Sequence, residues 1–210
     1  MSTASDPKSA QRPRSRAAAK EASREALIAA AITLFSRKGL DASLDEVCAM
    51  AGYTRGAFYV HFKDRDDLIA AVMDQIGQGW LDTLMGEGQA QDFAAVIAQF
   101  TQSLKSGAHP VSRSGGVRPY QLLDACVRSP AIREGYLRQV AAATGRIRTA
   151  LEAAQGAGAV RPDIDAASIA ALLEAAVIGL EVLHDLDAPI DLDASAAALL
   201  TLLKASAPRA

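Results

Sequence analysis

Two helix starts separated by one glycine turn, between residues 43 and 62, constrain this chain more than its other sequence features. Ser43 stands three residues before Glu46, the spacing of a capping box in which the two side chains satisfy each other's backbone amides. Gly52 ends the short helix that follows, and Thr54 offers the next N-cap. The pattern predicts two short helices joined by a tight turn, the arrangement of a helix-turn-helix.

A longer helix on each side of this pair is positioned to brace it. Before the pair, apolar residues recur at offsets of three, four, seven and eight and form one stripe: Leu27, Ala30, Ala31, Leu34 and Phe35. Gly39 can end that helix in the left-handed conformation. After the pair, Asp64 to Asp67 suit the first turn of a helix that runs to Ile76. Short helix pairs also occur in other all-α proteins, so this pattern alone leaves a purely structural pair open.

The rest of the chain is also predicted to be helical. Ala, Leu, Glu, Gln and Arg are abundant, and no stretch alternates apolar and polar residues over the length of a strand. Helices are expected over about 93–104, 119–128, 130–154 and 165–186, and from 191 or 193 to 204. The fold class is therefore all-α, with about nine or ten helices.

Positive charge is concentrated near the N-terminus. The formal net charge is −2, yet six basic residues and one acidic residue lie between Lys8 and Arg24. A basic arm on an otherwise acidic protein indicates a local anionic partner, or else a solvated tail that aids solubility. We expect residues 1–19 to form a flexible arm whose Arg12, Arg14 and Arg16 either contact nucleic acid or attract it over a distance.

The cellular compartment is expected to be the cytoplasm. Cys48 and Cys126 stand among Ala, Val and Leu and form no CxxC pair, which fits a reducing environment and inert, buried thiols. The sequence shows no signal-peptide pattern and no run approaching 18 apolar residues, so a soluble protein without membrane contact is predicted.

No enzymatic or metal-binding pattern is visible. His61, His109 and His184 are far apart, and the sequence contains no HExxH spacing, nucleophile elbow or phosphate-binding glycine loop. The pair His184-Asp185 is interpreted as a solvated helix end rather than part of a catalytic triad. We therefore expect no catalysis, no metal and no cofactor.

Several separated elements occur together in the order and at the spacings of one known family. They are Ala30–Gly39 with its Leu-Phe pair, Ser43–Gly52, Thr54–Phe62 with its Tyr-x-His-Phe ending, and Arg65–Leu68. Together they resemble the N-terminal domain of the tetracycline-repressor (TetR) family over about residues 24–72. The chain departs from the family pattern in having Arg65 where lysine is usual, so that this residue could pair differently, and Tyr53-Thr54 where Val-Ser is frequent.

The resemblance implies a set of residues that contact double-stranded operator DNA. Thr54 and Arg55 would face phosphates or base edges, with Arg55 the candidate for a bidentate contact to guanine. Tyr59, His61 and Lys63 match positions that touch the phosphate backbone. Ser43 could hold a phosphate, although capping is its expected role. The domain limits that follow are 1–19 for the arm, 20–66 for the three-helix DNA-binding domain and 67–210 for a larger helical domain of ligand binding and dimerisation.

The last two helices indicate a homodimer. The helix from Asp165 has one apolar face with Ile169, Leu172, Leu173, Ala176, Val177 and Leu180. Its opposite face is apolar too, which requires two partners: either a central position within one subunit or a subunit interface. The resemblance favours an isologous interface, for which the expected residues are Ala171, Ala175, Ile178, Gly179, Val182, Leu199 and Leu203.

The resemblance also implies a small-molecule pocket among the middle helices. Residues that either line it or form ordinary core are Trp80, Leu84, Phe100, Leu104, Tyr120, Leu123 and Cys126. No charged cluster in this region indicates the ligand, and an apolar or weakly polar effector is expected. The function predicted is a transcriptional regulator that binds a pseudopalindromic operator as a homodimer and is released by its effector, a repressor rather than an activator; the alternative is an all-helical ligand-binding or interaction module without operator binding.

Overall fold

The computed structural model describes residues 16–86, 92–109 and 116–204, and within these ranges it contains helices and no strand. The first elements are α1 (Arg16–Lys38), a 3-10 turn (Gly39–Asp41), α2 (Leu44–Ala51), α3 (Arg55–Phe58) and α4 (Arg65–Met85). The later elements are α5 (Phe93–Ser106), α6 (Pro119–Arg128), α7 (Pro130–Gly156), α8 (Ala166–Asp185) and α9 (Leu192–Leu203). The predicted all-α class is confirmed.

Most helices begin at the caps that the sequence predicts. The Ser43–Glu46 capping box is present, with the Ser43 amide 2.8 Å from the Glu46 carboxylate. Ser129 accepts from the Ile132 amide, and α7 has Pro130 in its first turn. Asp165 and Asp191 cap α8 and α9 in the same way. The N-terminal helix differs from expectation: Arg16 to Ala19, assigned to the basic arm, form the first turn of α1, while residues 1–15 lie outside the described residues.

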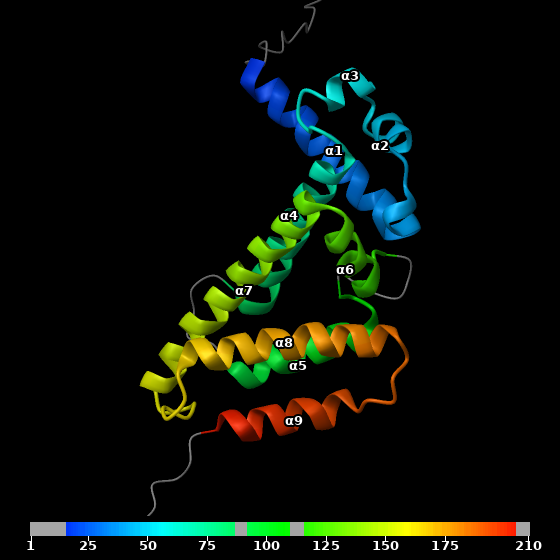
Figure 1. Cartoon of the computed structure of the whole chain (residues 1–210). Coiled ribbons are helices and arrows are strands. Elements are labelled where there is room, and N and C mark those ends of the chain that lie inside the picture. Colours follow the sequence, from blue (N-terminus) through cyan, green and yellow to red (C-terminus); the bar gives the residue numbers. More distant parts are fainter. Residues whose placement is uncertain (1–15, 87–91, 110–115, 205–210) are drawn as a thin grey trace, which may run out of the picture.

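The helices form two packed groups joined by α4 and α7. Figure 1 shows α1, α2 and α3 at one end, and α5, α8 and α9 lying side by side across the other end. Between them α4 and α7 run next to each other over most of their length. α6 lies beside this pair, under the N-terminal group.

The N-terminal core extends beyond the first three helices. Its fully buried side chains include Leu27 of α1, Phe58 of α3 and Leu68 of α4, and the same cluster takes in Cys126 of α6 and Ile132 of α7. Residue 66, the expected domain limit, therefore falls within α4, and α4 contributes to both halves of the molecule. A movement of α4 or α6 would therefore displace the helices of the N-terminal group, because close-packed cores transmit displacement.

The end of α8 differs from its predicted environment. His184-Asp185 was expected to be solvated, but Asp185 is buried, with its Oδ1 3.5 Å from Nη1 of Arg118 at the start of α6. The His184 ring lies 3.1 Å from the Leu104 carbonyl at the end of α5. These contacts join α5, α6 and α8, which the separation of the residues in the sequence did not reveal.

Candidate nucleic-acid interface and internal cavity

The turn between α2 and α3 depends on Gly52. Its φ is +74°, in the left-handed region that favours glycine, and nothing lies within 4 Å of the position a Cβ would take. Its amide and that of Tyr53 bond to the last carbonyls of α2. Thr54 then caps α3, accepting from the Ala57 amide at 3.3 Å. The two helices form as predicted, although α3 ends at Phe58 and the chain continues to Phe62 as turns.

One side of α3 is anchored and the other is exposed. Phe58 is fully buried, with its ring 5.3 Å from that of Phe62. On the opposite side Tyr59 and Val60 are 58% and 60% exposed, together with Thr54 and Arg55. Figure 1 shows α3 at the outer edge of the molecule, at the end away from α8 and α9. This position leaves α3 accessible to a large partner.

Arg55 is held by α2 in this structure. Its Nε and Nη2 donate to the two carboxylate oxygens of Asp45, at 2.5 and 2.8 Å. Both side chains are more than half exposed, and exposed ion pairs contribute little to stability. The guanidinium can therefore exchange Asp45 for another planar acceptor at small cost, which is the contact predicted with guanine.

Ser43 and His61 are engaged within the domain. The Ser43 hydroxyl serves the capping box, the role that the sequence favours over phosphate binding. The Ser23 hydroxyl donates to the Lys20 carbonyl, so its oxygen accepts from His61 Nε2 at 2.7 Å. Burial, followed by the charges of Lys20 and Arg24, lowers the pKa of His61. His61 thus ties the turn after α3 to α1, and its phosphate contact stays a prediction.

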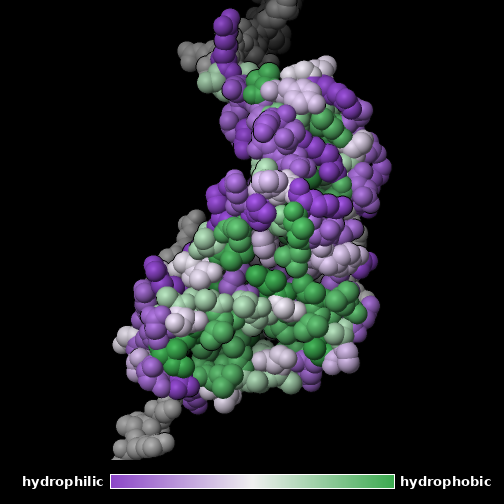
Figure 2. Space-filling view, viewed as in Figure 1, coloured by the Kyte–Doolittle hydropathy of each residue, from purple (hydrophilic) through white to green (hydrophobic). Residues whose placement is uncertain are grey.

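Lys63 and the start of α4 complete the exposed surface. The Lys63 side chain is exposed, and its backbone amide donates to Asp67 Oδ2 at 3.0 Å. On α1, Arg24 lies over the Phe62 ring, 5.7 Å from its centroid. Figure 2 shows that hydrophilic residues dominate this end of the molecule in the face that it presents.

An internal cavity of about 210 Å³ lies in the C-terminal half, among α4 to α9. Of the predicted residues, Trp80, Leu84, Phe100 and Leu123 line it. Leu104, Tyr120 and Cys126 do not: Leu104 is buried in a neighbouring cluster, Tyr120 is 44% exposed, and Cys126 belongs to the N-terminal core. Burial raises the pKa of both cysteine thiols, as expected for inert side chains.

Sequence reasoning missed the ionisable groups of the cavity. His109, Tyr136, Glu174 and Glu181 all line it, although no charged cluster was visible in the sequence. They come from three different segments, so nothing in the linear order gathers them. The available signal was the pair Glu174 and Glu181, seven residues apart and so on one face of an otherwise apolar helix.

The apolar residues of α8 and α9 divide differently from the prediction. Among those expected at an interface, Leu203 is buried in the subunit core, and Ile178 and Leu199 line the cavity. Leu172, placed on the opposite apolar face of this helix from the expected interface residues, is 71% exposed, and Leu202 is 66% exposed. Ala171 and Ala175 are exposed, and Gly179 and Val182 are partly exposed, so their place in an interface stays a prediction.

Comparison with known proteins identifies the N-terminal part. The family model described as "Bacterial regulatory proteins, tetR family" matches residues 27–72. The regulator AcrR of Shigella flexneri is 42% identical over 52 residues, which are 24% of each protein. The TetR-family regulator from Cytophaga hutchinsonii superposes over 90% of this chain and 98% of its own, with a TM-score of 0.72 and 19% identity. E. coli NemR in its reduced form superposes over 89% of this chain and 99% of its own, with a TM-score of 0.69 and 19% identity.

Residues 27–72 are therefore similar to the N-terminal domain of TetR-family regulators. The structural likeness extends the family's fold over nearly the whole chain, whereas the curated relatives match over only 24% to 46% of their own length. TetR-family proteins are regulators of transcription that bind DNA through a helix-turn-helix. The resemblance to this family that the sequence predicts over residues 24–72 is confirmed by the match over residues 27–72.

One departure from the family pattern has a clear structural role. Arg65 stands where TetR proteins usually carry lysine, and its guanidinium donates to the carbonyls of Leu40 and Ala42. It therefore fixes the loop that carries the chain from α1 to α2. A lysine could not reach both carbonyls with a planar group.

α8 (Ala166–Asp185) is long and strongly apolar. By length and composition alone it passes as a membrane span, the one such helix among the described residues, but core helices of soluble proteins pass the same test. It packs against α7 and α6. No group of three or more metal-ligating side chains occurs in residues 16–86, 92–109 and 116–204.

Proposed function

We propose that this protein is a TetR-type transcriptional repressor that binds a pseudopalindromic operator as a homodimer and leaves it when a small effector binds. The observation that carries the proposal is the braced α2–turn–α3 unit with its outer side exposed, in the segment that matches the family model. Its protrusion suits a major groove about 12 Å wide.

The DNA contacts divide into base reading and backbone binding. Arg55, released from Asp45, would read guanine, and the exposed Tyr59 would contact the phosphate backbone, as the family pattern implies. Lys63 would hold a phosphate beside the first turn of α4. Thr54 and Ser43 keep their capping hydrogen bonds and position these side chains.

A homodimer through α8 and α9 is supported by the apolar surface there. Figure 2 shows hydrophobic residues spread over these two helices, in contrast to the other end. The large side chains involved are Leu172, Leu183, Leu186 and Leu202, all more than 40% exposed. Contiguous apolar surface of this kind marks an interaction site. A two-fold pair would place two α3 helices on successive half-sites.

The route from cavity to DNA passes through α4 and α6. Leu122 of α6 lines the cavity and also belongs to the N-terminal core. Ile76 and Trp80 of α4 line the cavity, and the same helix begins two residues after Lys63. An effector that prefers a shifted α4 or α6 would draw the population away from the conformer that fits the operator.

A gel shift with the intergenic DNA upstream of the protein's own gene tests the proposal. We expect a specific complex whose affinity falls steeply with salt, because phosphate contacts release counterions. Tyr59→Ala and Lys63→Ala should weaken it by about tenfold or more each. Lys105→Ala, which removes a positive charge beside Asp193 at the far end, is the matched control and should bind normally.

The same gel shift distinguishes the proposed regulator from the alternative function. A protein that binds no duplex would support a helical ligand-binding module without operator binding. Duplex binding that Tyr59→Ala and Lys63→Ala leave unchanged would instead overturn the assignment of these two contacts. A reporter gene placed behind the bound DNA then distinguishes repression from activation.

A further inference from the structure

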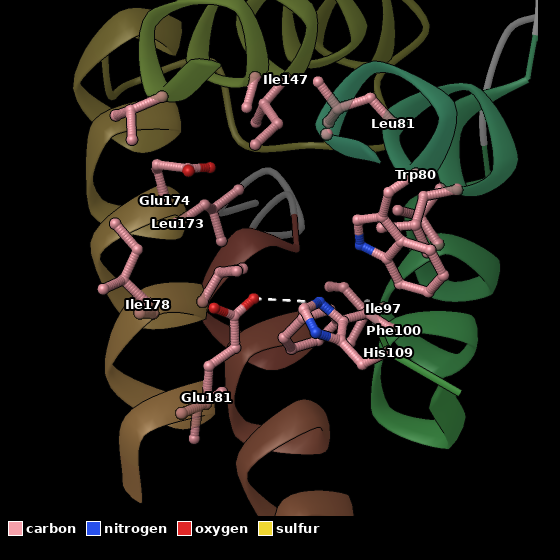
Figure 3. A pocket seen from close by; sticks show the side chains of 18 of the residues that line it. Trp80, Leu81, Ile97, Phe100, His109, Ile147, Leu173, Glu174, Ile178 and Glu181 are labelled. Carbon is pink, nitrogen blue, oxygen red and sulfur yellow. Dashed lines mark ion pairs between the residues drawn. The ribbon is translucent and has the colours of Figure 1, made fainter. Parts of the chain in front are cut away.

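The cavity combines apolar walls with acid groups and lacks fixed positive charge. Its lining among the described residues includes no lysine, arginine or aspartate. The ionisable side chains are His109, Tyr136, Glu174 and Glu181. Figure 3 shows Glu174 and Glu181 projecting from α8, with Trp80 and His109 on the other side of the space.

Glu181 already has a partner. His109 Nε2 lies 3.1 Å from Glu181 Oε1, and the His109 side chain is 4% exposed. The ring of His109 also packs edge-on against Trp80 at 4.9 Å and against Phe100 at 5.8 Å. These contacts fix the His109–Glu181 pair in the cavity wall.

Glu174 has no equivalent partner. No hydrogen bond or ion pair joins its carboxylate to the described residues, and Figure 3 shows it pointing from α8 into the cavity. Burial, and then the charge of Glu181, raise the pKa of Glu174 to about 7. An unpaired carboxylate in an apolar site is costly to ionise. A positively charged ligand would remove that cost.

We propose that the cavity binds an organic cation with an apolar body, seated with its positive nitrogen at Glu174. The inference rests on the proposed function, since it names the chemistry of the effector. The apolar walls bury the body of the ligand, and the Trp80 and Tyr136 rings add favourable contact with a cation. Among the described lining residues, an anion would meet two carboxylates and no lysine or arginine. The proposed effector is therefore positively charged, whereas the sequence led us to expect an apolar or weakly polar one.

The test compares three probes that share a benzyl group and differ in charge. They are benzyltrimethylammonium, its uncharged isostere in which carbon replaces nitrogen, and the anion phenylacetate. Binding to the full-length protein is measured by calorimetry, with fluorescence of Trp80, the chain's single tryptophan, as a second readout. We expect the cation to bind about tenfold or more tighter than the isostere, as a charge-assisted contact would give.

The variant Glu174→Gln keeps the shape and removes the charge, so the preference for the cation should vanish. Glu134→Gln, an equal change on the exposed side of α7, should keep it. Glu174→Asp retains the charge and should keep part of the preference. Circular dichroism of each variant confirms that it folds.

Each comparison has an outcome that would contradict the proposed cation site. Absence of cation binding, equal binding of cation and isostere, tighter binding of phenylacetate, or a preference that survives Glu174→Gln would each overturn the inference. Operator binding is measured in parallel. A protein that binds its operator but not the cation fails this inference alone, whereas one that binds the cation but no duplex fails the proposed function and leaves the cation site intact.

Discussion

Glu174 makes the stability of the unliganded protein depend on pH. In the unfolded chain its pKa is near 4.5, and in the folded chain it is about 7. The folded state therefore holds the proton more tightly, and the free energy of unfolding should fall as pH rises from about 4.5 to 7 and stay level above that. Below this window the group is protonated in both states and costs nothing.

Glu174→Gln should abolish this part of the pH dependence. At about pH 8 we expect the variant to unfold a few degrees higher than the parent, because the cost of a buried charge is gone. Thermal unfolding from pH 5 to 8, with Glu134→Gln as the exposed control, measures the difference. An identical pH profile for the parent and Glu174→Gln would contradict the assignment of this titration to Glu174.

Arg65 offers a second test at a single residue. Arg65→Lys replaces a guanidinium that donates to two carbonyls, those of Leu40 and Ala42, with a point charge that cannot span them. We expect the free energy of unfolding to fall by about 1–2 kcal/mol, measured by urea denaturation. Arg37→Lys, on the exposed end of α1, is the control and should change little. If both variants behave alike, the loop between α1 and α2 does not depend on Arg65.

At the scale of whole elements, the contact between α4 and α7 is set by glycine. A Cβ added at Gly135 would lie 3.0 Å from the Ala70 Cβ and 3.4 Å from its Cα, neither of which can move without its helix. Gly145 lies on the same helix, and nothing occurs within 4 Å of the Cβ it would gain. Two glycines of α7 thus occupy opposite environments.

Substituting alanine at each position should give opposite signs. Gly145→Ala should stabilise the protein by up to about 1 kcal/mol through helix propensity. Gly135→Ala should destabilise it by about 1–3 kcal/mol. The new methyl group would push α7 away from α4, and the packing energy lost in this way exceeds the gain in helix propensity. The denaturant midpoints of both variants, measured against that of the parent protein, test these two expected signs. Stabilisation by both substitutions would show that α7 can shift away from α4 freely.

The predictability of these elements follows from the range of the forces that form them. Caps such as Ser43 and Asp165 act within one helical turn, so the sequence alone places the starts of α2 and α8. Contacts between residues that are distant in the sequence cannot be predicted in this way. Leu203 and Leu172 are both leucines at plausible positions on apolar helices, yet one is buried and the other is 71% exposed. Only the packing of α8 and α9 on the other helices decides which side faces inward.

The same reasoning explains the cavity and the DNA-binding surface. The family pattern placed Arg55, Tyr59 and Lys63 on the exposed surface. The hydrogen bond from Arg55 to Asp45 joins residues of two helices, so the sequence did not predict it. Tyr120, Leu123 and Cys126 all lie on α6, and of these three only Leu123 lines the cavity. Helical spacing tells which residues share a face, and it leaves open what that face meets.

At the scale of the whole molecule, the two ends have contrasting surfaces. The end with α3 is largely hydrophilic, whereas α8 and α9 expose large apolar side chains that a single subunit leaves in water. Leu172 and Leu183 of α8 and Leu202 of α9 are 71%, 42% and 66% exposed within the subunit, which supports the proposed partner at this face. A two-fold pairing of these helices is the arrangement that covers both copies at once.

Leu172→Glu tests this assembly. In an isologous interface the substitution places two carboxylates, one from each subunit, in an apolar contact, so we expect dimer association to weaken by at least about a hundredfold. Operator affinity should fall with it, because two linked heads bind far more tightly than separate ones. Val127→Glu, at a 79% exposed position on α6 outside this face, is the matched control and should leave the dimer intact. Sedimentation velocity gives the mass of each species, and a Leu172→Glu protein that sediments as a stable dimer would move the subunit contact away from α8.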